Sequence, residues 1–288
     1  MTPDVQRLVD RRAQARADRD FAASDALRDE IAALGWVVRD TAEGQVVGAA
    51  PPYPVLRSVR DVLEKASTAA VGLLVEGWPD DIRTCVTALL EHTDVGIVLL
   101  ENGPTDAGAV VHELAEDPRV EELHVEQPAG WAEAHNALVR HSTAPVHVLM
   151  DPSTVLEGDA ISPLREALGT FGAAGWRGVR VDDGWLSFSD APPGEVEALL
   201  GYLIAVRRQL ALDVPLPAKA RYYRNADLEW SFLLRERGHR LLAVDVPVRQ
   251  DRHRGYHDSD PALRDKESKK TYDRFLQRFR GREELRLI

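Results

Sequence analysis

Residues 145–160 read PVHVLMDPSTVLEGDA, an apolar run that ends abruptly in an acidic loop. The run Val146–Met150 is β-branched and apolar, which is typical of a strand in a mostly buried sheet. It stops at Asp151, and a carboxylate at the carboxyl end of a central strand lies where open α/β sheets present ligand-binding groups. Asp-Pro-Ser is also ordinary turn chemistry, so this stretch alone leaves a plain strand-to-turn junction as the other interpretation.

Length and composition indicate a soluble globular protein with room for one large α/β domain and a small appendage, or for two ordinary domains. The chain has 288 residues, of which 44% are hydrophobic and 29% charged. No apolar run approaches the roughly 18 residues of a membrane span, and residues 1–17 lack the apolar core of a secretory signal. The single cysteine, Cys85, excludes an internal disulfide and a cysteine-built zinc site, so we expect a reducing, cytoplasmic location. A formal charge of −11 argues against broad, non-specific nucleic-acid binding by the whole molecule, although it leaves a local basic patch open; we expect cations and no DNA as partners.

The first 48 residues predict a helical hairpin followed by a small β-hairpin. Apolar residues recur at helical spacing over residues 2–17 and 20–34, with Asp20 as an N-cap and Gly35 as a stop. This region resembles the C-terminal helical segment of cysteinyl-tRNA synthetases. The matching residues are Arg12, Arg16, Asp20, Phe21, Ala22, Asp25, Arg28, Asp29, Gly35, Asp40, Thr41 and Gly44.

Nothing of the synthetase's catalytic domain follows, so the chain is not a synthetase. In that family the segment lies near the tRNA-binding end, and the resemblance therefore implies a tRNA contact. The alternative is a borrowed hairpin used for packing or for contact with another partner. Residues 1–48 carry seven Arg against nine Asp plus Glu, a balance that is poor for holding phosphates and favours the alternative.

A second domain is expected over residues 68–288, after a linker and connecting helix at 49–67. Ala49-Ala-Pro-Pro-Tyr53 has linker composition, and Val55–Lys65 is predicted to be an amphipathic helix. Strand-like and helix-like segments then alternate up to the Pro145 strand, without a glycine-rich phosphate loop. Such βα alternation predicts a largely parallel sheet with helices on both faces.

Five segments of this second domain carry another resemblance. They are Ile97–Asp106 (IVLLENGPTD), Gly130–Asn136 (GWAEAHN), Leu149–Thr154 (LMDPST), Tyr202–Arg208 (YLIAVRR) and Asn225–Ser231 (NADLEWS), the last followed by Gly238. In this order they resemble the inverting family-2 glycosyltransferases of the nucleotide-diphospho-sugar transferase (GT-A) fold. The resemblance implies a GT-A domain that binds a nucleotide-diphospho-sugar donor.

The resemblance also implies a nucleotide-binding role for three residues. Glu101 occupies the position where the family's Asp contacts the base, and Asn102 shapes the following turn. Asn136 lies on a helix that faces the nucleotide in the family. Each has an ordinary structural alternative, as a strand-end turn residue or a solvated helix residue.

Asp151 matches the first acid of the family's metal and ribose motif. Ser153 stands where the second acid coordinates the divalent cation, and an uncharged hydroxyl is a poorer ligand for a hard cation. We therefore expect weak binding of Mn²⁺ or Mg²⁺. His253 fits the place of a histidine that helps to bind the metal or diphosphate in related enzymes, and Arg252 beside it suits phosphate. A solvated polar loop is the other interpretation of residues 251–257.

Asp227 matches the catalytic base, because an attacking acceptor hydroxyl must lose its proton. Glu229 is secondary, and Asp227 may be read equally as the N-cap of a helix that begins near Leu228. The leading hypothesis is a sugar transferase acting on a small-molecule donor and an unknown acceptor. A catalytically degenerate nucleotide- or sugar-binding module is the alternative, motivated by Ser153 and by Glu76-Gly77-Trp78, where active relatives carry a polar turn. A tRNA-associated adaptor is the third hypothesis.

Overall fold

The structure is a computed structural model that describes residues 1–41, 44–65 and 69–287. It divides into two compact units, Met1–Pro54 and Val55–Ile288. The domain boundary predicted at residue 68 and the turn predicted at residues 42 and 43 lie outside the described residues.

The first unit is the predicted helical hairpin with a two-stranded antiparallel sheet. It contains α1 (Pro3–Ala17), α2 (Phe21–Ala33), β1 (Trp36–Thr41) and β2 (Gly44–Ala49). Thr2 and Asp20 cap the two helices through side-chain oxygens, as short polar residues do at this position. Val5, Val9, Ile31 and Val38 form its core.

A buried ion pair joins the helices of this unit to its sheet. Arg12 on α1 is 3% exposed and donates two hydrogen bonds to Asp40 on β1, at 2.9 and 2.8 Å. These bonds hold the pKa of Asp40 below its ordinary value. Both residues belong to the set that carries the synthetase resemblance, and the structure shows that they stabilise the unit itself.

The second unit is built on a mixed eight-stranded sheet in which β6 (Val146–Met150) occupies a central position. On one side of β6 lie the parallel strands β3 (Ala69–Val75), β4 (Gly96–Asn102) and β5 (Val120–Val125). On the other side lie β13 (Leu203–Arg207), β8 (Ala173–Gly175), β14 (Leu241–Ala243) and β11 (Gly194–Val196). Only β13 runs antiparallel to both of its neighbours within this sheet. The α/β fold with a largely parallel sheet is confirmed.

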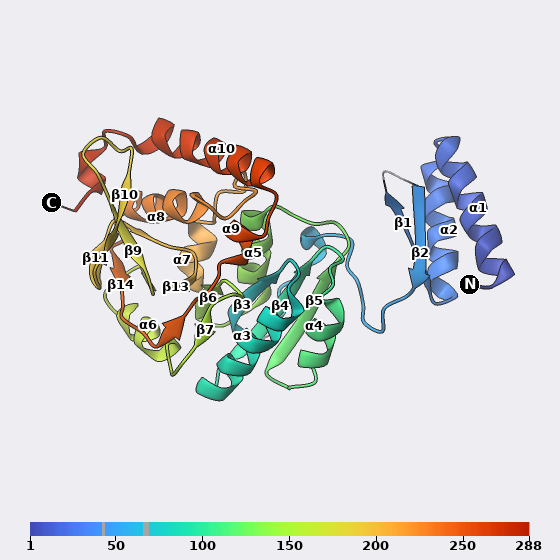
Figure 1. Ribbon diagram of the computed structural model, residues 1–288, viewed down its shortest axis with the longest axis horizontal. Helices are drawn as coiled ribbons and strands as arrows, with labels where there is room; N and C mark the ends of the chain where they lie inside the picture. The colour runs from blue at the N-terminus through green and yellow to red at the C-terminus, as the bar shows by residue number, and fades with distance from the viewer. Residues whose placement is uncertain (42–43, 66–68, 288) are drawn as a thin grey trace. The chain divides into compact units, whose positions relative to one another are not determined.

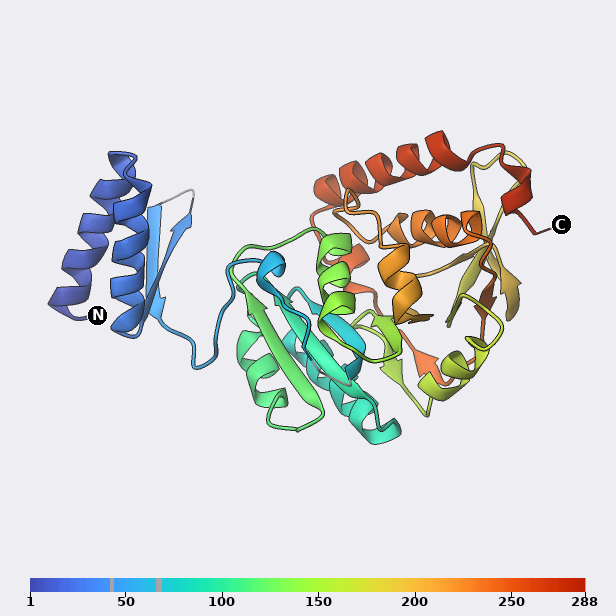
Figure 2. The same cartoon turned by 180° about the vertical axis from the view of Figure 1, so that it is seen from behind.

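Helices cover both faces of this sheet (Figures 1 and 2). On one face lie α3 (Pro79–His92), α4 (Gly108–Leu114) and α6 (Ile161–Ala167), packed against side chains of β3, β4 and β6. The opposite face carries α5 (Trp131–His141), α7 (Arg208–Asp213) and α8 (Ala226–Glu236). Two separate apolar clusters result, one on each face, and the buried thiol of Cys85 belongs to the first.

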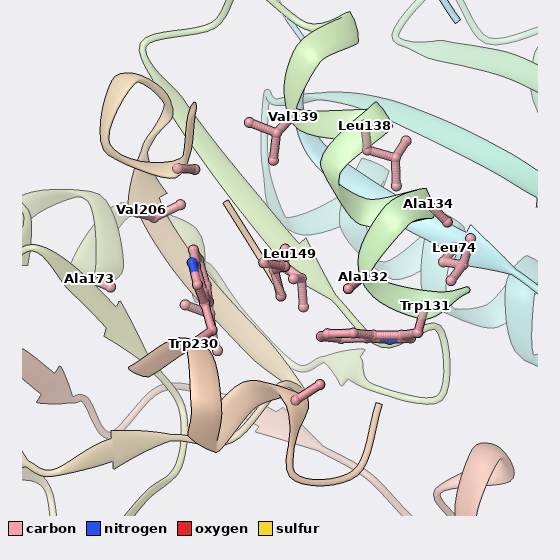
Figure 3. Packing of buried hydrophobic residues seen from close by; sticks show 14 of the residues in the cluster. Leu74, Trp131, Ala132, Ala134, Leu138, Val139, Leu149, Ala173, Val206 and Trp230 are labelled. Atoms are coloured by element: carbon pink, nitrogen blue, oxygen red, sulfur yellow. The ribbon is translucent and has the colours of Figure 1, made fainter. Parts of the chain in front are cut away.

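The cluster on the α5 face brings two tryptophans into the core (Figure 3). Trp131 enters it from the start of α5 and Trp230 from α8, around Leu149 of β6. The Trp230 indole N–H donates to the backbone oxygen of Val214 at 2.7 Å, so its buried polar atom is satisfied. Helices α5 and α8 are thereby fixed against the strand that ends at Asp151.

A third apolar cluster attaches the C-terminal helix to α8. The small sheet β10–β9–β12, with strands Phe188–Ala191, Gly178–Val181 and Ala198–Leu199, lies near this cluster. Helix α10 (Pro261–Phe279) contributes Phe275 and Phe279, which meet Phe232 of α8. The short strands β7 (Val155–Leu156) and β15 (Val248–Arg249) pair with each other, and α9 (Arg254–His257) follows.

The helix expected over Val55–Lys65 is wrong. Within these described residues only Val59–Asp61 forms a single 3₁₀ turn. Leu56 instead adds to the edge of β5, donating to His124 O at 2.8 Å and accepting from Glu126 N at 2.8 Å. The backbone groups at the open edge of β5 are available for these hydrogen bonds. The bonds favour an extended conformation at Leu56 over the helix that the weak amphipathic pattern predicted.

None of the helices within residues 1–41, 44–65 and 69–287 combines the length and the apolar character needed to cross a membrane.

Candidate active site

Asp151 lies directly after β6 in a tight turn. Its backbone N–H donates to Tyr202 O at 3.0 Å, which ties the turn to the segment that leads into β13. Its Oδ1 accepts from the backbone N–H of Ser153 at 2.8 Å and also from the Ser153 hydroxyl. The turn therefore leaves the second carboxylate oxygen, Oδ2, facing outward.

His253 meets that second oxygen. Its Nε2 lies 3.2 Å from Asp151 Oδ2, and its Nδ1 accepts from the backbone N–H of Tyr256 at 3.1 Å. Because Nδ1 accepts, the ring proton is assigned to Nε2, where it donates to Asp151. Removal from bulk solvent favours the neutral acid, but the bonds from His253 and Ser153 outweigh it and lower the pKa of Asp151. Asp151 is therefore anionic at neutral pH.

This pair offers a divalent cation two protein ligands. Asp151 Oδ2 and His253 Nε2, which lie 3.2 Å apart, are the atoms that would face such a cation. The Ser153 hydroxyl is an uncharged third donor, and Gln250 holds it from the other side at 3.1 Å. Among the described residues no group of three His, Cys, Asp or Glu side chains is arranged for a metal. Asp151, His253 and Ser153 alone would therefore give a cation few protein ligands.

Asp151 and His253 line a cleft with an internal volume of about 70 Å³. We call it the Asp151 cleft. Its other polar and aromatic lining side chains include Glu76, Trp78, Trp131, His135, Arg221 and Tyr222. Trp78 has the left-handed φ of 59°, which is uncommon for a bulky residue and accompanies the turn out of β3.

His135 and Glu76 give this cleft two unusual polar groups. Burial lowers the pKa of His135 to about 3, so the ring is neutral, and its Nδ1 has no hydrogen-bond partner within the described residues. Glu76 is exposed, but the enclosing cleft raises its pKa, as does the nearby charge of Asp151, while a bond from Asn102 opposes the rise. Sequence reasoning noticed the Glu76 turn only as a departure from the family pattern.

The segment Ala220–Asn225, read ARYYRN, is a part of the site that sequence reasoning missed. Backbone N–H groups at the start of α5 donate to the carbonyl oxygens of Ala220 and Arg221, both at 3.1 Å. A Cβ at Gly130 would come within 3.0 Å of Arg221 Cα, so glycine permits this approach. The sequence signal that could have indicated this segment is the pair of tyrosines flanked by two arginines, directly before a helix whose first turn is acidic.

Asp227 lies in the first turn of α8 and is 6% exposed. Its Oδ2 accepts from Gly201 N at 2.9 Å, and its Oδ1 accepts from Leu228 N at 2.8 Å. Burial raises the pKa of Asp227 to about 6, although both backbone bonds favour the anion. Asn225, with φ of 68°, is the N-cap of α8, so the expectation that Asp227 takes that position is wrong.

Asp227 opens onto a second cleft, of about 540 Å³, which we call the Asp227 cleft. Tyr223 and His253 line both clefts and form the wall between them. The aromatic rings of these two residues lie 4.3 Å apart between centroids. The structure therefore brings Asp151, Ser153, His253 and Asp227 together, with the two carboxylates on opposite sides of a shared wall.

Glu101 and Asn102 are used inside the protein instead. Glu101 is 4% exposed, accepts from Thr105 at 2.8 Å through Oε1, and lies 2.6 Å from His124 through Oε2. Burial opposes both charges, but the mutual bonds lower the pKa of Glu101 and raise that of His124. Asn102 bonds Glu76 at 3.1 Å and both backbone groups of Ala129. Neither residue lines the Asp151 or the Asp227 cleft.

Three further residues have structural partners. Asn136 exchanges two hydrogen bonds with the backbone of Leu216, at 2.8 and 3.0 Å, and so anchors the chain after α7. Arg252 is paired with Asp258 at 2.7 Å, outside the Asp151 cleft. Glu229 is buried in a two-bond pair with Arg274 of α10. Glu229 is therefore not available as a second base.

Comparison with known families assigns the two units separately. Residues 1–47 match the cysteinyl-tRNA ligase anticodon binding domain. The cysteine–tRNA ligase of Nitratidesulfovibrio vulgaris (strain Miyazaki F) is 62% identical over 42 residues, 15% of this chain and 9% of the ligase. That of Leuconostoc citreum is 49% identical over 45 residues, 16% of this chain and 10% of the ligase. The match thus spans about a tenth of each ligase.

Residues 75–259 match glycosyl transferase family 2. Among solved structures, GalNAc-T7 with UDP, GalNAc and Mn²⁺ superposes with a TM-score of 0.61 at 16% identity, covering 73% of this chain and 48% of that one. The mannosyltransferase PcManGT from Pyrobaculum calidifontis, in complex with GDP-Man and Mn²⁺, gives 0.54 at 20% identity, covering 72% and 62%. At such identities the likeness concerns the fold, and the predicted GT-A fold is confirmed.

Proposed function

The chain belongs to glycosyl transferase family 2, and we propose that it transfers a sugar from a nucleotide-diphospho-sugar to an acceptor hydroxyl, with inversion at the anomeric carbon. One observation carries the proposal. Asp151 and Asp227 line different clefts that share a wall of Tyr223 and His253. An in-line attack needs this division, because the leaving nucleotide and the incoming hydroxyl must lie on opposite faces of the sugar.

The Asp227 side supplies the base. A carboxylate with a pKa of about 6 is ionised at neutral pH and is still basic enough to accept a proton from an attacking hydroxyl. Its two backbone hydrogen bonds fix the carboxylate toward the Asp227 cleft, so no side-chain rearrangement is required before attack.

The Asp151 side holds the donor. Asp151 and His253 are placed to share a divalent cation with the donor diphosphate, and Arg221 adds a cation to the same cleft. When bound, the cation neutralises the charge that develops on the leaving diphosphate. A neutral imidazole would hold a cation only through its unprotonated nitrogen, so the ring of His253 would have to turn, or carry its proton on Nδ1 instead of Nε2. Mn²⁺ accompanies the nucleotide in both structural neighbours, which supports this arrangement.

The test measures release of nucleoside diphosphate from UDP-, GDP- and TDP-sugars, with and without Mn²⁺, beside calorimetric nucleotide binding. Asp227→Asn should keep nucleotide affinity near that of the wild type while turnover falls by about two to four orders of magnitude. Asp151→Asn should weaken binding of nucleotide with Mn²⁺. If the wild type binds a nucleotide but turns over no donor, the sugar-transfer assignment fails and the binding-module alternative replaces it.

A contact with tRNA is a second candidate function, favoured by the 62% identity of residues within 1–47 to a ligase segment. The excess of acidic residues there predicts that any such contact is weak and falls steeply with salt. A gel-shift titration with tRNA, using the chain without residues 1–54 as the control, tests it. Equal shifts for both chains would exclude a role for this segment.

A further inference from the structure

The Asp227 cleft has two unlike walls. One is apolar and includes Leu186, Phe188 and Leu228, of which Leu186 is 60% exposed. The other presents Tyr202, Tyr223 and Tyr256 with the imidazoles of His253 and His257 and the guanidinium of Arg224. Asp227 is the only carboxylate that lines the described cleft, and Arg224 is the only Lys or Arg.

Within the described residues Arg224, like Arg221 of the Asp151 cleft, is paired with no carboxylate, unlike several other arginines of this region. Arg252, Arg254, Arg264 and Arg274 each pair with a carboxylate at 2.9 Å or less. Arg224 is exposed, and within the described residues its side chain meets no carboxylate. Its guanidinium lies 5.1 Å from the centre of the Tyr256 ring, which also meets Arg264 at 4.6 Å. An aromatic ring orients a cation without neutralising it, so Arg224 keeps its full charge for another partner.

The presence of a base restricts what the acceptor's reacting group can be. A phosphate or carboxylate oxygen is already ionised at neutral pH, needs no base, and would be repelled by the anionic Asp227. The reacting group is therefore a hydroxyl, and Arg224 must recognise some other part of the molecule. Arg224 stands three residues before Asp227, at the N-terminal end of α8, so the two parts lie within one small molecule's reach.

We propose that the acceptor is an anionic hydroxyl compound, whose phosphate or carboxylate group is bound by Arg224 beside Tyr256 while its hydroxyl reaches Asp227. The inference rests on the proposed sugar transfer and names its acceptor class. The positive charge also protects the base. An acceptor anion left without a counter-charge would raise the pKa of Asp227 further and reduce the ionised fraction, and Arg224 offsets this.

The experiment compares matched acceptors with the best donor from the nucleotide panel. One set is glycerol, glyceric acid and glycerol 3-phosphate, and another is glucose, glucuronic acid and glucose 6-phosphate. We expect kcat/KM for at least one anionic member to exceed that of its neutral partner by about tenfold to a hundredfold, the usual effect of a charge-assisted bond. The member of the set with the higher kcat/KM, carboxylate or phosphate, identifies the anion that the site prefers. Either result supports the inference.

Arg224→Gln should bring that ratio to about one. Arg221→Gln, in the same segment but on the donor cleft, is the matched control and should weaken donor binding while leaving the ratio intact. Equal rates for neutral and anionic acceptors, or a ratio that survives Arg224→Gln, would overturn the inference.

A binding measurement separates this inference from the proposed function. If no donor is turned over, the sugar-transfer assignment fails, and calorimetric titration with glycerol 3-phosphate decides the anion site by itself. Binding that weakens at least tenfold in Arg224→Gln but not in Arg221→Gln supports the site. Absent binding to the wild type, or equal binding to Arg224→Gln, rules it out.

Discussion

The carboxyl group of Asp227 is buried and yet receives two backbone N–H groups, and the balance sets its pKa at about 6. Burial penalises the anion, whereas the bonds from Gly201 and Leu228 favour it. A carboxylate with this pKa is ionised at neutral pH. It is also a stronger proton acceptor than a solvent-exposed aspartate, whose pKa is lower. The structural environment therefore suits the catalytic role proposed for this residue.

This pKa predicts a pH profile. Only the ionised carboxylate accepts a proton, so kcat/KM of the wild type should fall about tenfold per pH unit below about 6 and level off above it. The residual rate of Asp227→Asn should lack this acid limb. Initial rates between pH 4.5 and 8.5, with circular dichroism confirming the fold at each pH, measure it. An acid limb that persists unchanged in Asp227→Asn would assign the titration to another group.

Ser153 gives a second prediction at this scale. Ser153→Asp places a charged oxygen beside Asp151, where Gln250 already holds the side-chain position, so we expect Mn²⁺ to bind at least tenfold more tightly. Ser153→Ala is the matched control and should change Mn²⁺ affinity by much less. Calorimetric titration of Mn²⁺ in the presence of a nucleoside diphosphate is the measurement. Identical affinities in all three proteins would place the cation away from Ser153.

Single residues also show where sequence reasoning reaches its limit. The positions of Asp151 and Asp227 at element ends follow from local pattern. The fate of Glu101 depends on His124, 23 residues away, and that of Asn136 on Leu216, 80 residues away. Neither partner is indicated by local sequence, so two residues expected at the nucleotide became internal anchors.

At the scale of elements, β3, β4 and β6 were predictable because each contains a compact apolar run that ends at polar residues. β6 forms where the pattern placed it, at Val146–Met150. Val55–Lys65 was not predictable in this way, because its conformation depends on the free edge of β5. The secondary structure of elements with their own hydrophobic pattern could thus be predicted, whereas that of a segment whose conformation depends on tertiary contacts could not.

Helix α9 is the element that joins the two clefts, and three side chains hold its region. His253 meets Asp151, Arg254 donates to Asp81 of α3 at 2.7 Å, and the Tyr222 hydroxyl bonds Gly255 O and, at 2.9 Å, Ser259. A four-residue helix has little stability of its own, so these bonds keep it folded.

Tyr222→Phe should therefore loosen this region. It removes the hydroxyl but leaves the ring, at an expected cost of about 1 kcal/mol. Amide hydrogen exchange over residues 253–259 should become faster, while exchange in β3 and β6 stays unchanged. Tyr256→Phe is the matched control, because within the described residues the Tyr256 hydroxyl has no hydrogen bond. Equal exchange in the two variants would show that Tyr222 does not hold α9.

At the scale of the whole molecule, the chain consists of two units with separate cores. Residues 1–54 have their own apolar core, which includes Val5, Val9 and Ile31. The buried charge of Arg12 is paired with the partly exposed Asp40. The residues proposed for donor binding and catalysis all lie in Val55–Ile288. Each unit therefore has what a domain needs in order to fold alone.

Removing residues 1–54 should leave a folded protein that binds nucleotide as the full chain does. Its thermal unfolding should remain cooperative and should coincide with one of the transitions of the full chain. Arg12→Ala in the full chain is the complementary change, because it strands the partly exposed Asp40 without its buried partner and should cost about 2 kcal/mol in the first unit only. Calorimetry of the three proteins, with and without nucleotide, compares these outcomes. Two outcomes would contradict this division: a lower nucleotide-stabilised transition in Arg12→Ala, or loss of cooperative unfolding in the shortened chain. In either case the stability of the site would depend on the core of the hairpin, and the two units would have to be treated as one folding unit.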